Sequence, residues 1–275
     1  MKVFVAVLAL VSAVLAAPTT DVSSPRLAFV NERITNGQDA AFGEFPYICS
    51  MQWVLIGTSS HICGSSIINN NWILTAAHCF TEIPNLGSIW AACGLTDLTI
   101  TTTQQRHMID ERVIHPLYPG GVAPNDIAVG RLAASLVFNA NVQPINLPTQ
   151  GLAPTIGTAV LAGWGSTSTT AIPSMPNRLQ RANKPVVTDQ QCCDLMNSVI
   201  AGACNNLASS NVCAGGGPIS ACSGDSGGPL SQQVGGTWTH IGIVSWGVTP
   251  CGTTVAPSVY VQTSAFRNWI DSSIN

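Results

Sequence analysis

The sequence predicts an all-β fold that ends in a single helix. Short apolar runs recur along the chain between glycine, proline and asparagine residues, as in residues 66–68, 72–74 and 241–244. Runs of this length between turn-forming residues are typical of strands. An apolar repeat of about 3.6 residues first occurs near the end, where Phe266, Trp269 and Ile270 would share one helix face. We therefore expect strands throughout, followed by one C-terminal helix at residues 263–275.

The first residues have the composition of a secretory signal peptide. Lys2 supplies a positive charge, residues 3–16 are almost wholly apolar, and small residues follow at Ala16 and Ala17. A membrane span needs about 20 apolar residues, so an uncleaved anchor is the weaker interpretation. We expect residues 1–16 to be a cleaved signal peptide, the protein to be secreted, and no membrane to be a partner.

Composition limits the classes of function. Charged residues make up 8% of the 275 residues, apolar residues make up 46%, and the net charge is −3. These values argue against disorder, and no run of lysine or arginine marks a nucleic-acid partner. After the leader the only lysine is Lys184. Few lysines offer few sites to trypsin-like enzymes, which hints at a digestive setting, although compositional drift explains the scarcity equally well.

Residues 224–230 (GDSGGPL) are the most informative motif. Alone, such a loop is often an ordinary polar turn. Three further motifs accompany it in a set order, namely residues 75–79 (TAAHC), 125–129 (NDIAV) and 245–247 (SWG). Together they resemble the chymotrypsin-like (trypsin-fold) serine proteases, closer to the chymotrypsin and elastase type than to trypsin.

The resemblance implies an architecture. It predicts two packed six-stranded antiparallel β-barrels with the active site in the cleft between them. The first barrel would span residues 34–148 and the second residues 149–262, with their join near residues 146–149. His78 and Asp126 would then come from the first barrel, and Ser226 from the second.

By resemblance, three residues form a catalytic triad. Ser226 is the expected nucleophile, activated by His78 as general base and later general acid, because an imidazole pKa of about 6.5 suits both roles. Asp126 would hold the imidazole in one tautomer and stabilise the imidazolium. The chain order His, Asp, Ser differs from that of subtilisin-like proteases and α/β-hydrolases. Alone, His78 could be a structural histidine and Asp126 a capping residue; the joint pattern favours catalysis.

The backbone amides of Gly224 and Ser226 are expected to form the oxyanion hole. They would stabilise the negative charge of the tetrahedral intermediate, and losing one such donor costs roughly 3 kcal/mol. Glycine suits the loop because it adopts positive φ without strain.

Residues 31–37 (NERITNG) resemble the family's activation junction, although Thr-Asn-Gly replaces the usual Val-Gly-Gly after isoleucine. Residues 17–33 would be an activation propeptide, and cleavage after Arg33 would free the α-ammonium of Ile34. By resemblance this ammonium pairs with the buried Asp225 and so fixes the nucleophile loop. The alternative is an exposed arginine in a leader, where cleavage would switch nothing.

The resemblance also places the substrate pocket. Ser220, six residues before the nucleophile, would form its base, and Ser258 stands on the opposite wall, where glycine is usual. Ser245, Trp246 and Gly247 would bind the substrate backbone through strand-type hydrogen bonds.

The pocket so assembled has no carboxylate. Burying a substrate cation there without a counter-charge would be costly, so lysine and arginine should be poor residues before the scissile bond. We expect large apolar or aromatic side chains instead; a small-aliphatic, elastase-like preference is the alternative. Activation after arginine would then need a separate trypsin-like protease.

Ten cysteines behind a signal peptide indicate disulfides. By resemblance, Cys63 pairs with Cys79, Cys222 pairs with Cys251, and Cys213 pairs with either Cys192 or Cys193. Cys204 would take the other of those two, and Cys49 and Cys93 remain to pair by elimination.

A zinc site is the competing interpretation of part of this set. It would use His61, Cys63, His78 and Cys79, but their spacing fits no usual zinc finger. The acidic ligands of the family's calcium loop are not evident in residues 94–103. No metal and no other cofactor is expected.

Other functions remain open on the same fold. A secreted pseudoprotease that acts as a binding module would commonly lose a triad residue, yet all three are kept. An esterase is disfavoured by the substrate strand. Ser65 stands where the family usually has glycine, near the nucleophile loop, and could slow catalysis. The expected partners are protein or peptide substrates, an activating protease and protein protease inhibitors, and the expected state is a monomer.

Overall fold

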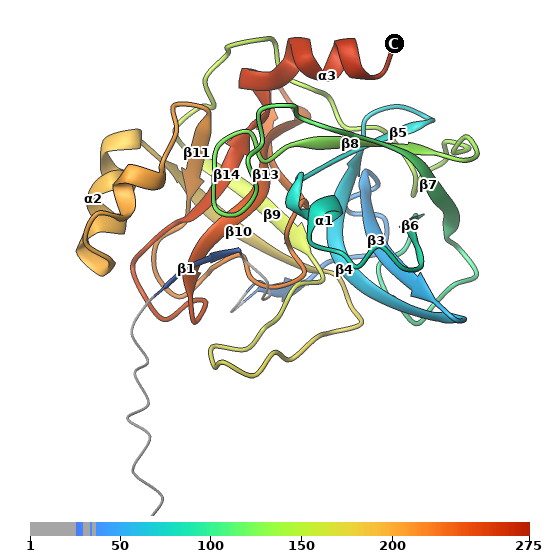
Figure 1. The fold of residues 1–275 in the computed structure, drawn as a ribbon, viewed down its shortest axis with the longest axis horizontal. Helices are drawn as coiled ribbons and strands as arrows, with labels where there is room; N and C mark the ends of the chain where they lie inside the picture. Colours follow the sequence, from blue (N-terminus) through green and yellow to red (C-terminus); the bar gives the residue numbers. More distant parts are fainter. Residues whose placement is uncertain (1–25, 30–33, 35–36) are drawn as a thin grey trace, which may run out of the picture.

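The computed structural model describes residues 26–29, 34 and 37–275 (Figure 1). The expected signal peptide and most of the expected propeptide, including Arg33, lie outside these residues. Within them, two closed barrels of six antiparallel strands lie against each other, which confirms the fold class predicted from the sequence.

The first barrel is formed by six strands in the order β3-β4-β5-β8-β7-β6. They are β3 (Ile48–Leu55), β4 (Thr58–Ile67), β5 (Trp72–Thr75), β6 (Ser88–Cys93), β7 (Gln105–Ile114) and β8 (Ala128–Leu132).

The second barrel follows the order β13-β12-β9-β10-β11-β14 and closes through the pairing of β13 with β14. Its strands are β9 (Thr158–Gly163), β10 (Gln180–Val187), β11 (Asn211–Ala214), β12 (Pro229–Val234), β13 (Thr237–Thr249) and β14 (Ser258–Gln262).

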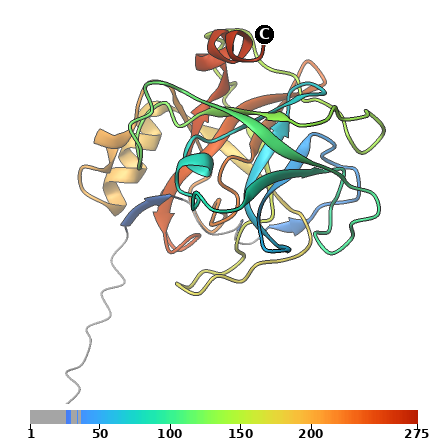
Figure 2. The same cartoon turned by 45° about the vertical axis from the view of Figure 1, so that its right-hand side comes forward.

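Two further strands attach to the outside of the second barrel. β2 (Gln38–Asp39) pairs with β10, and β1 (Arg26–Phe29) pairs with β13. Figures 1 and 2 both show β1 lying beside β13.

The helices lie outside the barrels. They are α1 (His78–Thr81), α2 (Asp189–Val199), η1 (Ala203–Asn206), η2 (Thr263–Phe266) and α3 (Arg267–Ser273), where η denotes a 3₁₀ helix. None of the helices in the described ranges is long and apolar enough to cross a membrane.

The C-terminal helix combines η2 and α3. Phe266 and Ile270 are buried in the core cluster of the first barrel, and Trp269 packs against that cluster. The segment therefore leaves the last strand of the second barrel and covers the first, which joins the two barrels.

The C-terminal helix was predicted, but helix α2 was not. Only Cys192 and Met196 of α2 are buried, so its apolar stripe is too narrow to reveal a helical period. Its start does carry a signal. Thr188 and Gln191 form a capping box, in which each side chain bonds the other's backbone amide.

A buried histidine also connects the barrels. His240 on β13 hydrogen-bonds Thr263 Oγ1 through Nδ1 at 2.8 Å and Ser66 Oγ of β4 through Nε2 at 3.1 Å. Burial lowers the pKa of His240 to about 3, so the ring is neutral at physiological pH.

Candidate active site

His78 and Asp126 are joined by two hydrogen bonds. His78 Nδ1 lies 2.8 Å from Asp126 Oδ2, and the backbone amide of His78 donates to Asp126 Oδ1 at 2.9 Å. His78 begins α1, with two residues between it and the end of β5, and Asp126 precedes β8, to which β5 pairs. Asn125 has a φ of 65°, a left-handed conformation that asparagine tolerates, and this turn precedes the buried carboxylate.

A third donor reaches the same carboxylate. Ser245 Oγ on β13 donates to Asp126 Oδ2 at 2.6 Å, across the interface between the barrels. The sequence suggested only a substrate-binding role for Ser245. The hydroxyl contact was missed, because sequence spacing cannot show which strand of the other barrel faces Asp126.

Electrostatics sets the protonation of this pair. Burial raises the pKa of Asp126, but the charge of His78 and the three hydrogen bonds outweigh it, so the pKa lies below its usual value. Burial lowers the pKa of His78, but the charge and hydrogen bond of Asp126 outweigh burial and raise it overall. The arrangement therefore favours a histidine that accepts a proton while Asp126 stays ionised.

The nucleophile loop is pressed against the segment that leads to His78. The amide of Gly64 donates to the carbonyl of Ser226 at 2.8 Å. A Cβ on Gly227, whose φ is 75°, would collide with Thr75 Oγ1 and lie 3.1 Å from the amide nitrogen of Ala76. Only glycine allows this approach, which places the loop carrying Ser226 beside the end of β5.

Gly224, His61 and His78 line the same cavity. Gly224 has a φ of 97°, and His61 Nε2 lies 3.0 Å from its carbonyl oxygen. His61 Nδ1 lies 2.8 Å from Ser50 Oγ, so the ring is held on both sides. The cavity, of about 490 Å³, also includes Cys63 and Cys79 in its lining. The sequence indicates His61 only as a candidate zinc ligand, whereas in the structure its ring supports the Gly224 peptide.

Asp225 is enclosed within the second barrel. Its Oδ1 accepts from the Gly165 amide and its Oδ2 from the Cys222 amide, both at 3.0 Å. A Cβ on Gly163 or on Gly165 would collide with its carboxyl group, so the carboxylate fits only because both are glycine. Ile34 is fully buried in the core cluster that includes Cys222. The side chain of Ile34 is therefore buried in the uncleaved chain, in which Arg33 and Ile34 are still joined.

Comparison with known proteins decides the family. A family model described as Trypsin matches residues 34–270. The chain belongs to the trypsin family. Trypsin-1 of Astacus astacus is 36% identical over 246 residues, covering 87% of this chain and 99% of that protein. Lectizyme of Glossina austeni is 35% identical over 287 residues, covering 100% of this chain and 97% of that protein. The protein is therefore a trypsin-family serine protease.

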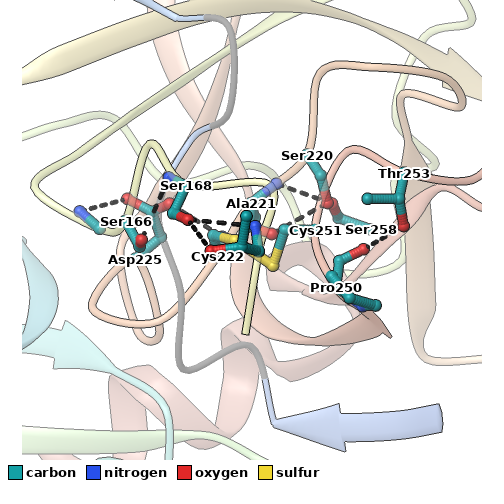
Figure 3. Close-up of a disulfide and its surroundings, with 12 residues drawn as sticks. Ser166, Ser168, Ser220, Ala221, Cys222, Asp225, Pro250, Cys251, Thr253 and Ser258 are labelled. Atoms are coloured by element: carbon teal, nitrogen blue, oxygen red, sulfur yellow. Dashed lines mark hydrogen bonds between the residues drawn. A yellow bond between two sulfur atoms is a disulfide. The ribbon is translucent and has the colours of Figure 1, made fainter. Parts of the chain in front are cut away.

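In this trypsin-family chain, the two serines assigned to the pocket lie together. Ser220 Oγ is 3.4 Å from Ser258 Oγ and donates to the Ala221 carbonyl at 2.9 Å, while the Ala221 amide donates to Ser258 Oγ at 3.0 Å. Figure 3 shows them beside the Cys222–Cys251 disulfide. The sequence did not reveal that Lys184 Nζ also donates to Ser258 Oγ, at 2.8 Å.

The edge assigned to substrate is occupied by the chain itself. β1 pairs antiparallel with β13, with Ala28 opposite Gly247 and Phe29 opposite Trp246. Ser245 and Trp246 are buried. An expected propeptide segment therefore lies where the sequence placed the substrate backbone.

The structure shows which cysteines pair where the sequence left two arrangements open. Cys192 bonds Cys213 and Cys193 bonds Cys204, alongside the bridges Cys49–Cys93, Cys63–Cys79 and Cys222–Cys251.

The same disulfide bonds contradict the zinc interpretation. The ligand atoms of Cys63, His78 and Cys79 do lie within 4.8 Å of one another. However, the two sulfurs are bonded to each other, and His78 Nδ1 is engaged by Asp126. No thiolate remains in this group to bind a metal.

The side chain of Ser65 does not press on the loop that carries Ser226. It is buried, and its hydroxyl donates to the Cys49 carbonyl at 3.4 Å. The close approach to the loop is made by Gly64, where a Cβ would stand 2.7 Å from Gly228 Cα. The unusual serine therefore points at the neighbouring strand rather than at the loop.

Proposed function

We propose that this trypsin-family protein is a serine endopeptidase that works through Ser226, His78 and Asp126. The observation that carries the proposal is the buried carboxylate of Asp126, whose hydrogen bonds hold His78 by ring and backbone together. A histidine fixed in this way beside the loop of Ser226 is what general-base activation of a serine hydroxyl requires.

In the first half of the reaction, Ser226 Oγ attacks the scissile carbonyl carbon while His78 takes its proton. The amides of Gly224 and Ser226 would stabilise the oxyanion, and His78 then protonates the leaving amine as the acyl-enzyme forms. In the second half, His78 takes a proton from water, the hydroxide attacks the ester, and Ser226 recovers its proton.

The substrate class follows from the floor of the pocket. Ser220 and Ser258 offer hydroxyls and no carboxylate, so a substrate lysine or arginine would be buried without a counter-charge. We propose a preference for large apolar or aromatic side chains before the scissile bond. The bulk of Ser258 could shorten the pocket, and a preference for small aliphatic side chains would be the consequence.

Secretion as an inactive precursor is the second part of the proposal. Cleavage after Arg33 would create the ammonium of Ile34, whose partner would be Asp225 in its glycine-lined enclosure. The pairing of β1 with β13 supports a further reason for latency, since a peptide substrate needs that same edge. Residues 17–33 contain no cysteine, so no disulfide would retain the segment after cleavage.

Peptide hydrolysis before and after activation tests the proposal. The recombinant precursor is assayed with chromogenic peptides that carry Phe, Leu, Ala or Arg before the scissile bond, with and without trypsin treatment. We expect activity on Phe and Leu after treatment only, and none in Ser226→Ala. A preference for Arg would overturn the pocket assignment. If no peptide is hydrolysed although mass spectrometry verifies the cut after Arg33, a binding module would be the better conclusion.

A further inference from the structure

Lys184 is a cation in a place built for an apolar residue. It lies on β10, where Ala182, Lys184 and Val186 are buried while Asn183 and Pro185 are exposed. Lys184 is fully buried, which is rare for lysine unless it is paired. Gly215 makes the room, because a Cβ there would stand 3.1 Å from Lys184 Nζ.

The surroundings of Lys184 offer it little compensation. Its ammonium donates one hydrogen bond, to Ser258 Oγ, and lies 5.7 Å from the ring centroid of Tyr260. In the part of the chain that the structure describes, no carboxylate forms an ion pair with it. Burial lowers the pKa of Lys184 to about 7, and the nearby charge of Asp225 only partly opposes this. A buried, weakly paired ammonium favours the arrival of an anion.

Ser258 connects Lys184 to Ser220, the residue expected at the base of the pocket. Two N–H groups, Lys184 Nζ and the Ala221 amide, donate to Ser258 Oγ. A hydroxyl oxygen accepts through two lone pairs, so the Ser258 hydroxyl can itself only donate, and the acceptor within reach is Ser220 Oγ at 3.4 Å. The buried hydroxyl of Tyr260 makes no hydrogen bond of standard geometry among the described residues, and Ser258 is the hydroxyl that interacts with it. The cluster beneath Ser220 is thus rich in donors, and it fits a ligand that only accepts.

We propose that Lys184 is a specificity-determining residue that lets the primary pocket accept a side chain ending in a carboxylate, glutamate above all. The proposal rests on the proposed function and refines its substrate class. Glutamate joins the apolar side chains because its carboxylate would accept from hydroxyls that Lys184 polarises, while its methylenes line the walls. Arginine before the scissile bond should be disfavoured for two reasons: the pocket floor lacks a carboxylate, and it holds the cation of Lys184.

A structural role for Lys184 is the competing account. In that account Lys184 only balances the charge of Asp225, and its removal alters stability or activation but leaves the choice of substrate unchanged. The ratio of cleavage between glutamate and glutamine peptides separates the two accounts, because the two side chains have nearly the same shape and differ in charge.

The experiment uses the trypsin-activated protein and three peptides that differ only in Glu, Gln or Leu before the scissile bond. In the wild type at pH 6.5 we expect kcat/KM for Glu to exceed that for Gln by about tenfold, the difference between a charged and a neutral hydrogen bond. In Lys184→Met the ratio should fall to about one or below. In Arg131→Met, which removes a surface cation of the first barrel, the wild-type ratio should persist.

A second measurement keeps the inference testable if Lys184→Met does not fold. In the wild type, the Glu-to-Gln ratio should fall as pH rises above neutrality and the ammonium loses its proton. In the activated protein the Ile34 ammonium also loses its proton above neutral pH, but this should lower cleavage of all three peptides together rather than the Glu-to-Gln ratio. The other titratable groups that face Lys184 do not change their charge in this range. Asp225 is buried beside two amide donors, and burial raises the pKa of Tyr260 far above this range.

Each outcome has one meaning. Cleavage of the Leu peptide with equal rates for Glu and Gln would overturn the role of Lys184 and leave the protease assignment intact. A ratio above one that survives Lys184→Met would also overturn it. Failure to cleave any of the three peptides, including Leu, would instead remove the proposed function on which the inference rests.

Discussion

Ser245 Oγ and His78 Nδ1 share one oxygen of Asp126, at 2.6 and 2.8 Å. Ser245 belongs to the strand assigned to the substrate backbone, and His78 belongs to the other barrel. The carboxylate therefore ties the position of β13 to the orientation of the His78 ring, the proposed general base.

Removing the Ser245 hydroxyl tests this connection. Ser245→Ala should lower kcat by about tenfold, because one hydrogen bond to a buried charged group contributes roughly 1.5–3 kcal/mol. KM should change less, since the backbone of β13 is retained. The measurement is steady-state hydrolysis of a Leu peptide by the activated protein. Ser245→Thr, which keeps the hydroxyl, is the matched control, and equal kcat values for the two variants would contradict the role.

The pH dependence of kcat/KM should report the raised pKa of His78. Activity requires a neutral imidazole, so it should fall as pH falls through that pKa, with a midpoint above the ordinary value of about 6.5. Asp126→Asn removes the charge that raises it. The midpoint should then move to lower pH, and kcat should drop by roughly four orders of magnitude because the tautomer is no longer fixed. An unchanged midpoint in Asp126→Asn would contradict the electrostatic account.

The buried His240 should make the fold sensitive to acid. Its folded pKa of about 3 lies below its unfolded value, so the unfolded chain binds more protons between these two values. The free energy of unfolding should therefore fall as pH falls below about 6.5. His240→Gln should cost about 1–3 kcal/mol at pH 7 and less at pH 4. Urea unfolding in a Ser226→Ala background, which prevents self-digestion, measures both; a loss independent of pH would count against this assignment.

Lys184 should act in the same direction over a higher pH range, between its folded pKa of about 7 and the ordinary lysine value. Its folded pKa of about 7 lies below the ordinary lysine value, so the buried charge destabilises the fold most at and below neutral pH. Lys184→Met should raise the free energy of unfolding at pH 7 by about 1–4 kcal/mol, as when buried charges are replaced by apolar side chains. The gain should shrink as pH rises towards about 10, where the unfolded lysine also loses its proton. Destabilisation at pH 7 would show that the ammonium is well compensated.

The sequence revealed strands and motifs but not contacts between distant side chains. The strands were predictable because short apolar runs and turn residues repeat, and the two barrels because the local motifs around His78, Asp126 and Ser226 resemble those of the family. Helix α2 was missed because two buried residues leave too weak a period. The partners of Lys184 could not be found, because the glycine and serine around it come from other strands and loops.

The pairing of β1 with β13 predicts a change in backbone protection on activation. The amides of residues 246–249 lie opposite residues 26–29 in the precursor, so deuterium exchange there should be slow. Cleavage after Arg33 frees a segment without cysteine, and exchange in residues 245–249 should then rise as the edge opens to substrate. Ala28→Pro, which removes a backbone donor from β1, should raise exchange in the uncut precursor. The control is Arg131→Met, which leaves β1 unaltered. Equal exchange before and after cleavage, measured by mass spectrometry, would show that β1 does not guard the substrate edge and that latency rests on the Asp225 loop alone.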